Sequence, residues 1–309
     1  MEPFLSILIP VYNYDPMPLL CSLQKQIERY ELGQIELLVG DDASSSEYKD
    51  IYAALTQFPW VRLITAEKNG GAGAMRNLLA REAKGPLLLC LDSDITLLTD
   101  QFLATYIAAS DGKSVVFGGH VYADYPPSKE QMLYYCYGRK IESRTALERN
   151  KHPYKAIGGV SFLIPRAIML AVPFDEEVRM GYEDALWGAN LKEARIPIKH
   201  IDNPIRHELR RNNEEFLCTT RHYIENLHRF EARFPKGTVR LLDVTKKYDF
   251  LVPLGAWLFS MENSYMERRL CGKRPSLTLF QIYKWTYLCD RMSKENNEVR
   301  RVNRNKKIN

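Results

Sequence analysis

Two aspartates, Asp92 and Asp94, stand one residue apart directly after the apolar run Leu87–Leu91. Burying unpaired carboxylates is costly, so these side chains should face water, a cation or a ligand at the edge of the core. Side chains two positions apart in an extended segment point to the same side, so both carboxylates could bind one cation. A hard divalent ion such as Mg²⁺ or Mn²⁺ often takes few protein ligands and completes its shell with substrate phosphates.

The same pair has less specific interpretations. Asp-x-Asp also occurs at helix N-caps, in solvated loops and in calcium-binding loops. The calcium loop is excluded, because the downstream Gly and Glu of its ladder of oxygen ligands are missing from this sequence. The helix cap and the solvated loop stay open on this pair alone.

A second stretch, Asn69–Asn77, reads NGGAGAMRN and combines small residues with one arginine. Glycines let the backbone approach a ligand closely, and the first amides of a helix that begins here would attract an anion. Arg76 adds a positive charge one turn into that helix. A plain turn is the alternative, because Asn-Gly is a strong turn signal by itself.

The elements that would position these residues alternate regularly over the first hundred residues. Apolar runs typical of buried strands are followed by apolar residues at helical spacing, including a helix over Ala72–Ala83. This alternation predicts a parallel sheet covered by helices on both faces, with ligands bound at the carboxyl ends of the strands. The predicted strands are Phe4–Val11, Ile35–Val39, Trp60–Ile64 and Pro86–Leu91, and the polar residues that follow them are Tyr12, Asn13, Asp41, Asp42, Asp92, Ser93 and Asp94.

The second half is less regular and becomes helical from about Phe216. Its predicted elements are strands over Ser114–Gly119, Val160–Ile164 and Ile196–Ile201 and a helix over Glu183–Ala194. The fold class that we predict is α/β, with a mixed, mainly parallel sheet flanked by helices and a helical C-terminal extension. We expect one catalytic domain over residues 1–210 and the extension over 211–309.

Composition and missing motifs narrow the function further. The chain has 309 residues, 45% of them hydrophobic, as expected for a globular protein. No GxGxxG follows the first strand and no Walker sequence occurs, which argues against hydride transfer and phosphate-loop chemistry. The N-terminus does not resemble a signal peptide and no apolar run is long enough to span a membrane, so we expect a cytoplasmic protein.

The formal net charge of +5 is concentrated at the C-terminus. From Lys284 onward there are eight Lys or Arg residues against three Asp or Glu residues. Such a tail could be solvated and disordered, or it could contact an anionic membrane surface. Aromatic and basic segments of the C-terminal region, among them FLVPLGAWLF and FQIYKWTYL, favour helices that pack on the catalytic domain, with peripheral membrane contact as the alternative.

Five segments in the same order as in a known family carry a specific resemblance. SILIPVYN, LLVGDDASS, NGGAGAMRNLL with AKGPLLLCLDSDI, and GYEDALWGANLKEA together resemble an inverting family 2 glycosyltransferase with the GT-A nucleotide-sugar-binding fold. The resemblance covers about residues 4–210.

The resemblance implies roles for residues on the donor side. In that family the end of the first strand and the second aspartate after the second strand hold the base and ribose, which implicates Pro10, Tyr12 and Asp42. Arg76 matches an arginine near the nucleotide. Asp92 and Asp94 match the motif that binds the ribose and the metal, a Mn²⁺ or Mg²⁺ ion, with Asp94 the more direct ligand. Ile95 replaces a further aspartate that the family often has at this position.

The resemblance also implicates the acceptor side. The aspartate of the Glu-Asp pair serves the family as general base, which implies that Asp184 takes the proton of the acceptor hydroxyl and that Glu183 lies on the acceptor side. Acidic residues at a helix start also simply complement the helix dipole. Some members place a histidine like His207 near the metal, whereas a surface histidine beside Arg206 and Arg210 is the competing interpretation.

The implied function is transfer of a sugar with inversion from a nucleotide-diphosphate donor, most often a UDP-sugar, to a hydroxyl of a glycan or lipid-linked acceptor. Polysaccharide or lipopolysaccharide assembly is the implied setting, and no nucleic-acid partner is expected. The alternative function is that of a non-catalytic nucleotide-sugar-binding subunit in a glycan-assembly complex. Acceptor identity would depend on residues 120–160, which show no pattern that predicts it.

Overall fold

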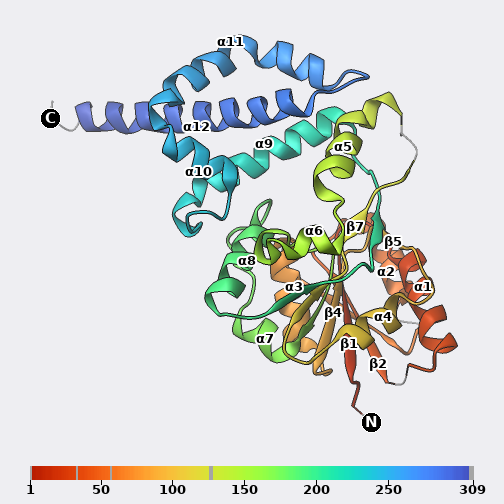
Figure 1. The fold of residues 1–309 in the computed structure, drawn as a ribbon. Coiled ribbons are helices and arrows are strands. Elements are labelled where there is room, and N and C mark those ends of the chain that lie inside the picture. Colours follow the sequence, from red (N-terminus) through yellow and green to blue (C-terminus); the bar gives the residue numbers. More distant parts are fainter. Residues whose placement is uncertain (1, 33, 56–57, 125–127, 306–309) are drawn as a thin grey trace. The chain divides into compact units, whose positions relative to one another are not determined.

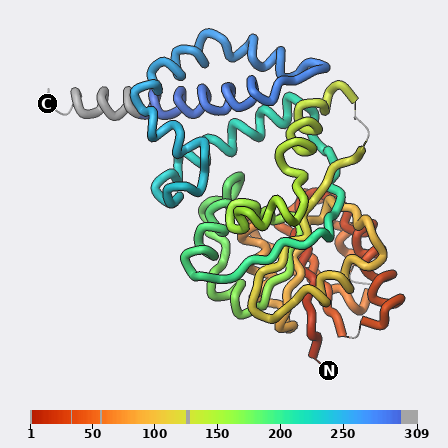
Figure 2. The backbone as a smooth tube through the Cα atoms, in the orientation of Figure 1, coloured from red at the N-terminus to blue at the C-terminus, as the bar shows by residue number. Residues whose placement is uncertain are grey.

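The computed structural model describes residues 2–32, 34–55, 58–124 and 128–305, with the backbone alone described for 296–305. Contacts divide the chain into two compact units. The first unit consists of residues 1–123, 141–179 and 183–208, and the second of residues 124–140, 180–182 and 209–309. Figure 2 follows the backbone of both units from the N-terminal strands to the C-terminal helices.

The first unit is built on a mixed sheet with the strand order β3-β2-β1-β4-β8-β6-β9. Neighbouring strands run parallel except at β8, which is antiparallel to both β4 and β6. These strands are β1 (Leu5–Val11), β2 (Ile35–Asp41), β3 (Val61–Thr65), β4 (Leu87–Leu91), β6 (Val115–Phe117), β8 (Ser161–Pro165) and β9 (Ile198–His200). The mixed, mainly parallel sheet that the sequence predicts is confirmed.

A smaller sheet of three short strands lies in the same unit, in the order β5-β10-β7. Its strands are β5 (Ile95–Leu97), β7 (His120–Val121) and β10 (Ile205–His207). The predicted strand Ser114–Gly119 ends early, at Phe117, because the chain then turns toward this second sheet. Gly119 makes the turn with a φ of +85°, a conformation that favours glycine.

Helices cover both faces of the main sheet, as Figure 1 shows. Ile7 of β1 packs on one face among residues of α1 and α4, including Leu23 and Phe102. Its neighbour Leu8 faces the opposite side and packs with Leu79 of α3 and with α8. This alternation explains why the strands are apolar on both faces. The helices of the first unit are α1 (Met17–Arg29), α2 (Lys49–Leu55), α3 (Gly71–Glu82), α4 (Phe102–Ala109), α6 (Ala146–Asn150), α7 (Arg166–Ala171) and α8 (Glu183–Glu193).

The second unit is helical. Its helices are α5 (Met132–Tyr137), α9 (Asn213–Arg229), α10 (Arg240–Lys247), α11 (Val252–Leu270) and α12 (Leu277–Asn305). Helices α11 and α12 pack so closely at Gly255 that a Cβ atom there would lie only 2.7 Å from the sulfur of Cys289.

Short helical turns occur in both units, at Ser46–Tyr48, Lys129–Gln131, Gly138–Glu142, Pro153–Lys155, Glu231–Arg233 and Asp249–Leu251. None of the helices in the described part of the chain has the length and hydropathy needed to cross a bilayer.

Candidate active site

Asp92, Asp94 and His207 come together at the carboxyl end of β4. The backbone N–H of Asp92 donates to the carbonyl of Val160 at 2.9 Å, which fixes the chain as it leaves the strand. The chain then enters β5, whose antiparallel pairing with β10 sets His207 opposite Ile95 and thus beside Asp94. Ligand atoms of Asp92, Asp94 and His207 lie within 4.8 Å of one another.

The chemistry of these three side chains fits a divalent cation. Two carboxylates and one imidazole suit Mn²⁺, and the carboxylates suit Mg²⁺ as well. Ligand bonds of about 2.1 Å place two ligand atoms of one ion no more than about 4.2 Å apart. Small side-chain rotations would therefore bring all three residues onto one ion. All three are only partly buried, so an ion and its substrate could reach them.

Arg76 is a buried cation beside this group. Its side chain is 3% exposed, and Nη2 donates to Asp92 Oδ1 at 2.5 Å and to the carbonyl of Gly159 at 2.9 Å. The guanidinium also lies 5.5 Å from the ring centroid of Phe174, a favourable cation–π distance.

The charges in this group shift one another's protonation equilibria. Burial by itself would lower the pKa of Arg76, but the charges of Asp92 and Asp184 outweigh it and raise that pKa. Burial raises the pKa of Asp92, opposed by the charge of Arg76 and reinforced by that of Asp94. Two carboxylates near one buried arginine thus leave negative charge that a bound cation would neutralise.

Asp184 reaches the same region from the first turn of α8. Its Oδ2 accepts a hydrogen bond of 2.9 Å from the backbone N–H of Gly159. The other oxygen, Oδ1, is buried and has no hydrogen-bond partner among the residues that the structure describes. One side of the carboxylate is therefore fixed, and the other retains its capacity to accept a proton. Glu183 precedes it in the same helical turn.

Gly159 joins Arg76 to Asp184, a role that we did not predict from the sequence. Its carbonyl accepts from Arg76 while its N–H donates to Asp184. A Cβ atom at this position would lie 2.7 Å from Asp184 Oδ1 and 2.9 Å from Arg76 Nη1, so a larger residue would displace one of them. The pair Gly158-Gly159, just before β8, is the sequence feature from which a close contact here could have been predicted.

Three further residues pack behind His207 and were also missed. The ring centroids of His120 and Tyr122 lie 6.2 Å and 5.8 Å from that of His207. The hydroxyl of Tyr122 donates to Glu142 Oε2, and His120 Nε2 lies 3.8 Å from the same oxygen. Burial would raise the pKa of Glu142, but its contacts with His120 and Tyr122 and the charge of His207 lower it.

Asp42 lies at the beginning of α3 and is engaged by the backbone. Its two carboxylate oxygens accept hydrogen bonds of 2.8 Å from the N–H groups of Gly70 and Gly71. The anion bound by these first amides is therefore the chain's own carboxylate. Each oxygen retains a further lone pair for a ligand.

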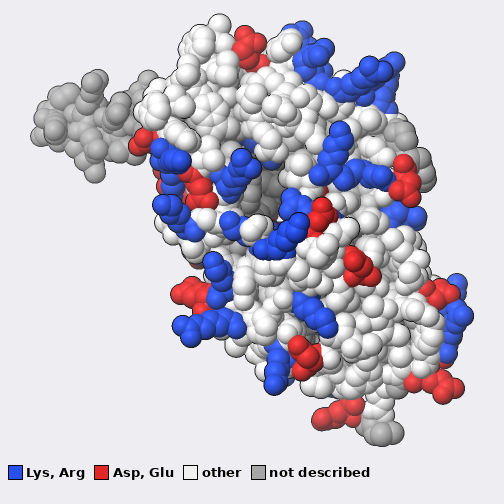
Figure 3. Space-filling model, in the orientation of Figure 1, with Lys and Arg blue, Asp and Glu red and all other residues white. Residues whose placement is uncertain are grey.

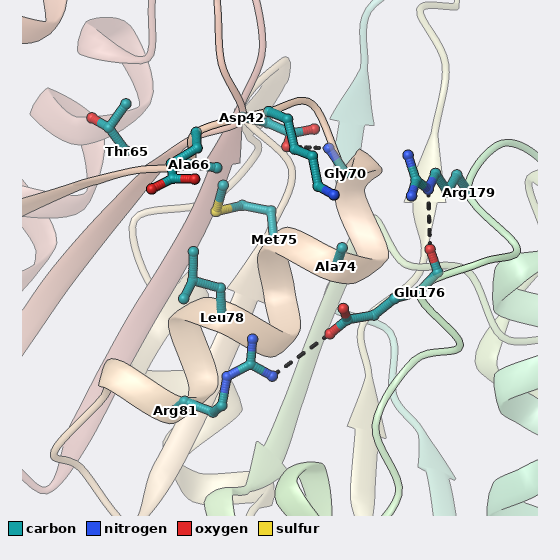
Figure 4. A pocket seen from close by; sticks show the side chains of 12 residues that line it. Asp42, Thr65, Ala66, Gly70, Ala74, Met75, Leu78, Arg81, Glu176 and Arg179 are labelled. Carbon is teal, nitrogen blue, oxygen red and sulfur yellow. Dashed lines mark hydrogen bonds and ion pairs between the residues drawn. The ribbon is translucent and has the colours of Figure 1, made fainter.

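A pocket of about 430 Å³ lies beside Asp42 and runs along α3, with residues 65–68, Glu176 and Arg179 completing its lining (Figure 4). Its lining includes Gly70, Ala74 and Arg81 but none of Arg76, Asp92, Asp94, His207 or Asp184. The pocket and the acidic group thus lie on different sides of the same helix. The two remaining donor-side candidates lie on β1 and just beyond it: Pro10 is buried in the strand opposite Gly40, and the side chain of Tyr12 is 51% exposed.

Comparison with known proteins identifies the family. The model of glycosyl transferase family 2 matches residues 6–168, more than half of the chain. The chain belongs to glycosyl transferase family 2. The family resemblance expected from the sequence motifs is confirmed, and the matched span contains Asp42, Arg76, Asp92 and Asp94.

Relatives of this family 2 chain are distant. It is 29% identical over 137 residues to the uncharacterized glycosyltransferase YwdF of Bacillus subtilis, covering 42% of this chain and 50% of that protein. The chain spans half or less of the length of the curated relatives it matches.

Solved structures share the fold. The mannosyltransferase PcManGT from Pyrobaculum calidifontis, in complex with GDP-Man and Mn²⁺, matches with a TM-score of 0.56 and 14% identity, over 94% of this chain and 87% of that one. The S. aureus protein TarS, residues 1–349 with UDP-GlcNAc, matches with a TM-score of 0.50 and 17% identity, over 96% and 92%. Identities this low support the GT-A-like fold of the family 2 chain and nothing finer.

Proposed function

We propose that this family 2 chain is a metal-dependent, inverting glycosyltransferase that uses a nucleotide-sugar donor. The observation that carries the proposal is the continuous set of contacts from Asp92 through Arg76 and Gly159 to Asp184. These contacts hold a candidate metal ligand, Asp92, close to a candidate general base, Asp184. We assign the chemistry to residues 1–210 and regard residues 211–309 as a helical extension.

The donor end of the reaction would depend on Asp94, His207 and Asp92. We propose that these side chains hold a Mn²⁺ or Mg²⁺ ion, with Asp94 as the most direct ligand. When bound, such an ion supplies Lewis-acid neutralisation of the charge on the departing nucleoside diphosphate. Arg76 orients Asp92 through its hydrogen bond and opposes the rise in the pKa of Asp92 that burial causes. Pro10, Tyr12 and Asp42 are proposed to contact the nucleotide.

Asp184 is proposed as the general base. Its carboxylate takes the proton of the acceptor hydroxyl as the acceptor oxygen bonds to the anomeric carbon. The bond from that carbon to the diphosphate oxygen breaks at the same time, and its electron pair leaves with the diphosphate. One displacement from the opposite face inverts the configuration. The hydrogen bond from Gly159 holds Asp184 in place, and Glu183 is proposed to face the acceptor.

The substrates are proposed by class. The related folds in the PcManGT and TarS structures bind GDP-Man and UDP-GlcNAc, which supports a nucleotide sugar here but does not distinguish uridine from guanosine. We keep a UDP-sugar as the donor, a hydroxyl of a glycan or lipid-linked molecule as the acceptor, and cell-surface polysaccharide assembly in the cytoplasm as the setting.

The alternative is a non-catalytic nucleotide-sugar-binding subunit. Retention of Asp184 together with both metal-type carboxylates favours an enzyme, because binding alone needs no general base. Purified protein should be incubated with a panel of UDP-, GDP- and dTDP-sugars and Mn²⁺, and release of the nucleoside diphosphate measured with and without glycan acceptors. Release from one donor that an acceptor stimulates is expected. Tight binding of a donor without any release of nucleoside diphosphate would contradict the proposed transferase activity and favour a non-catalytic binding subunit.

A further inference from the structure

Helix α11 of the second unit is apolar on two opposite sides. One side is buried and carries Val252, Ala256, Met266 and Leu270. The other side carries the exposed residues Leu254, Trp257, Met261 and Tyr265, whose side chains are 52% to 64% exposed. A helix that packs on one side only is normally polar on the other, so this arrangement calls for a second contact.

The exposed residues form one continuous face, which we call the α11 outer face and define as Leu254, Trp257, Met261 and Tyr265. Their spacings of three or four residues align them along one side of the helix. Phe250, in the helical turn Asp249–Leu251 just before α11, adds a side chain that is 72% exposed. In Figure 3, much of the surface over α11 is white, with Lys and Arg side chains gathered beside it.

Basic residues frame both ends of this face. Between residues 244 and 274, the exposed charged side chains are those of Lys246, Lys247, Arg268, Arg269, Lys273 and Arg274 against Asp249 and Glu262. Arg268 follows Tyr265 by three residues and so continues the α11 outer face by one turn. The acid Glu267 belongs to the other side, where it accepts from Arg221 and Tyr283.

We propose that the α11 outer face docks on an anionic lipid surface. Trp and Tyr suit the interface between lipid tails and headgroups, because each has an apolar ring and a polar group. Arginine and lysine at both ends attract anionic headgroups. An amphipathic helix of this composition lies in the plane of the interface with its apolar side in the lipid.

The charges disfavour a second copy of the chain as the occupant of this face. Two copies of α11 packed face to face in parallel would bring Arg268 and Arg269 against the same residues of the partner. Packed antiparallel, these arginines would face the end that carries Lys247 and Lys246, where Lys246 lies 3.6 Å from Glu231 and Asp249 is exposed. The parallel orientation places like charges opposite one another, and the antiparallel one gains little from charge. A surface of negative headgroups has no such conflict.

The test is sedimentation of the full chain with vesicles, without donor or metal, so that its result is independent of the proposed transferase activity. Wild-type protein should sediment with mixed phosphatidylcholine–phosphatidylglycerol vesicles and much less with phosphatidylcholine alone. Trp257→Gln combined with Met261→Gln should lower vesicle affinity at least about tenfold, because two large apolar side chains are lost from the contact. Arg268→Gln and Arg269→Gln should each lower it about fivefold, and salt should weaken the binding.

Matched controls are available in the first unit. Leu147 and Leu170 are also exposed, and changing either to Gln should leave vesicle affinity unchanged. Circular dichroism checks that each variant is folded. Wild-type protein that fails to sediment, or a Trp257→Gln/Met261→Gln variant that sediments equally well, would overturn the proposal. A dimer in solution that this variant abolishes, without vesicle binding, would assign the face to a second copy instead.

Discussion

Two pairs of aspartates leave the same sheet on either side of β1, and the fold uses them differently. Asp41 and Asp42, at the end of β2, are bound by backbone N–H groups: Asp41 accepts from Ser44, and Asp42 accepts from Gly70 and Gly71. Asp92 and Asp94, after β4, instead face side chains, namely Arg76 and His207. The backbone therefore holds the β2 pair in place, whereas the β4 pair belongs to the candidate metal site.

This difference teaches what makes an acidic pair functional. Backbone amides neutralise a carboxylate in place and leave it little to gain from a cation. The β4 pair has one buried arginine for two carboxylates, with a third, Asp184, nearby. Such a group gains from a divalent cation. We call Asp92 and Asp94 the β4 edge and expect substitutions there to affect metal binding and transfer. We call Asp41 and Asp42 the β2 edge and expect substitutions there to lower the stability of the fold first.

The largest effect should come from Asp184→Asn, which removes the proposed base but keeps the shape of the side chain. Transfer should fall by about 10²-fold to 10⁴-fold with donor affinity unchanged. Glu193→Gln at the other end of α8, where the side chain is exposed, serves as the control and should be active. A variant that retains more than about a tenth of the wild-type rate would remove Asp184 from the role of base.

A smaller effect is expected from Glu142→Gln, because the contacts of Glu142 are with His120 and Tyr122 and it affects His207 through its charge. We expect Glu142 to be a positioning residue whose loss lowers Mn²⁺ affinity about 10-fold to 100-fold, as for other outer-sphere partners of metal ligands. Titration with Mn²⁺ followed by electron paramagnetic resonance measures this affinity, and thermal unfolding separates it from stability. A lower melting temperature with unchanged Mn²⁺ affinity would make Glu142 a purely structural residue.

The smallest effect should be that of Asp42→Asn at the β2 edge. One side-chain oxygen becomes an NH₂ group that faces a backbone N–H, which should lower the free energy of unfolding by about 1–3 kcal/mol. Urea denaturation measures this, with the exposed Asp50→Asn as the control. Unchanged stability would mean that the bonds to Gly70 and Gly71 matter little, and would weaken the contrast between the two edges.

The sequence predicts the main sheet well, because its strands are continuous apolar runs. Strands β1 to β4 and helices α3 and α8 begin and end within two residues of the predicted positions. The small sheet was not predicted. Strands β5, β7 and β10 have only two or three residues each, and they form because their partners from distant segments are nearby, not because of a local pattern.

The candidate site shows the same division. Asp92 and Asp94 were recognisable from their position after an apolar run, and Arg76, His207 and Asp184 from the family resemblance. Gly159, His120, Tyr122 and Glu142 were missed because their roles depend on contacts across long stretches of chain. Sequence spacing also could not distinguish Asp42, which the backbone binds, from Asp92, which faces an arginine.

The most direct test of the central claim compares Mn²⁺ affinity at the two acidic pairs. Three proteins should be titrated with Mn²⁺ by calorimetry, each in the presence of the same nucleoside diphosphate. They are the wild type, Asp94→Asn and Asp41→Asn. We predict at least an about tenfold loss for Asp94→Asn, since even outer-sphere changes cost this much, and unchanged affinity for folded Asp41→Asn. Equal losses in both variants, or a loss in Asp41→Asn alone, would contradict the assignment of the metal to the β4 edge.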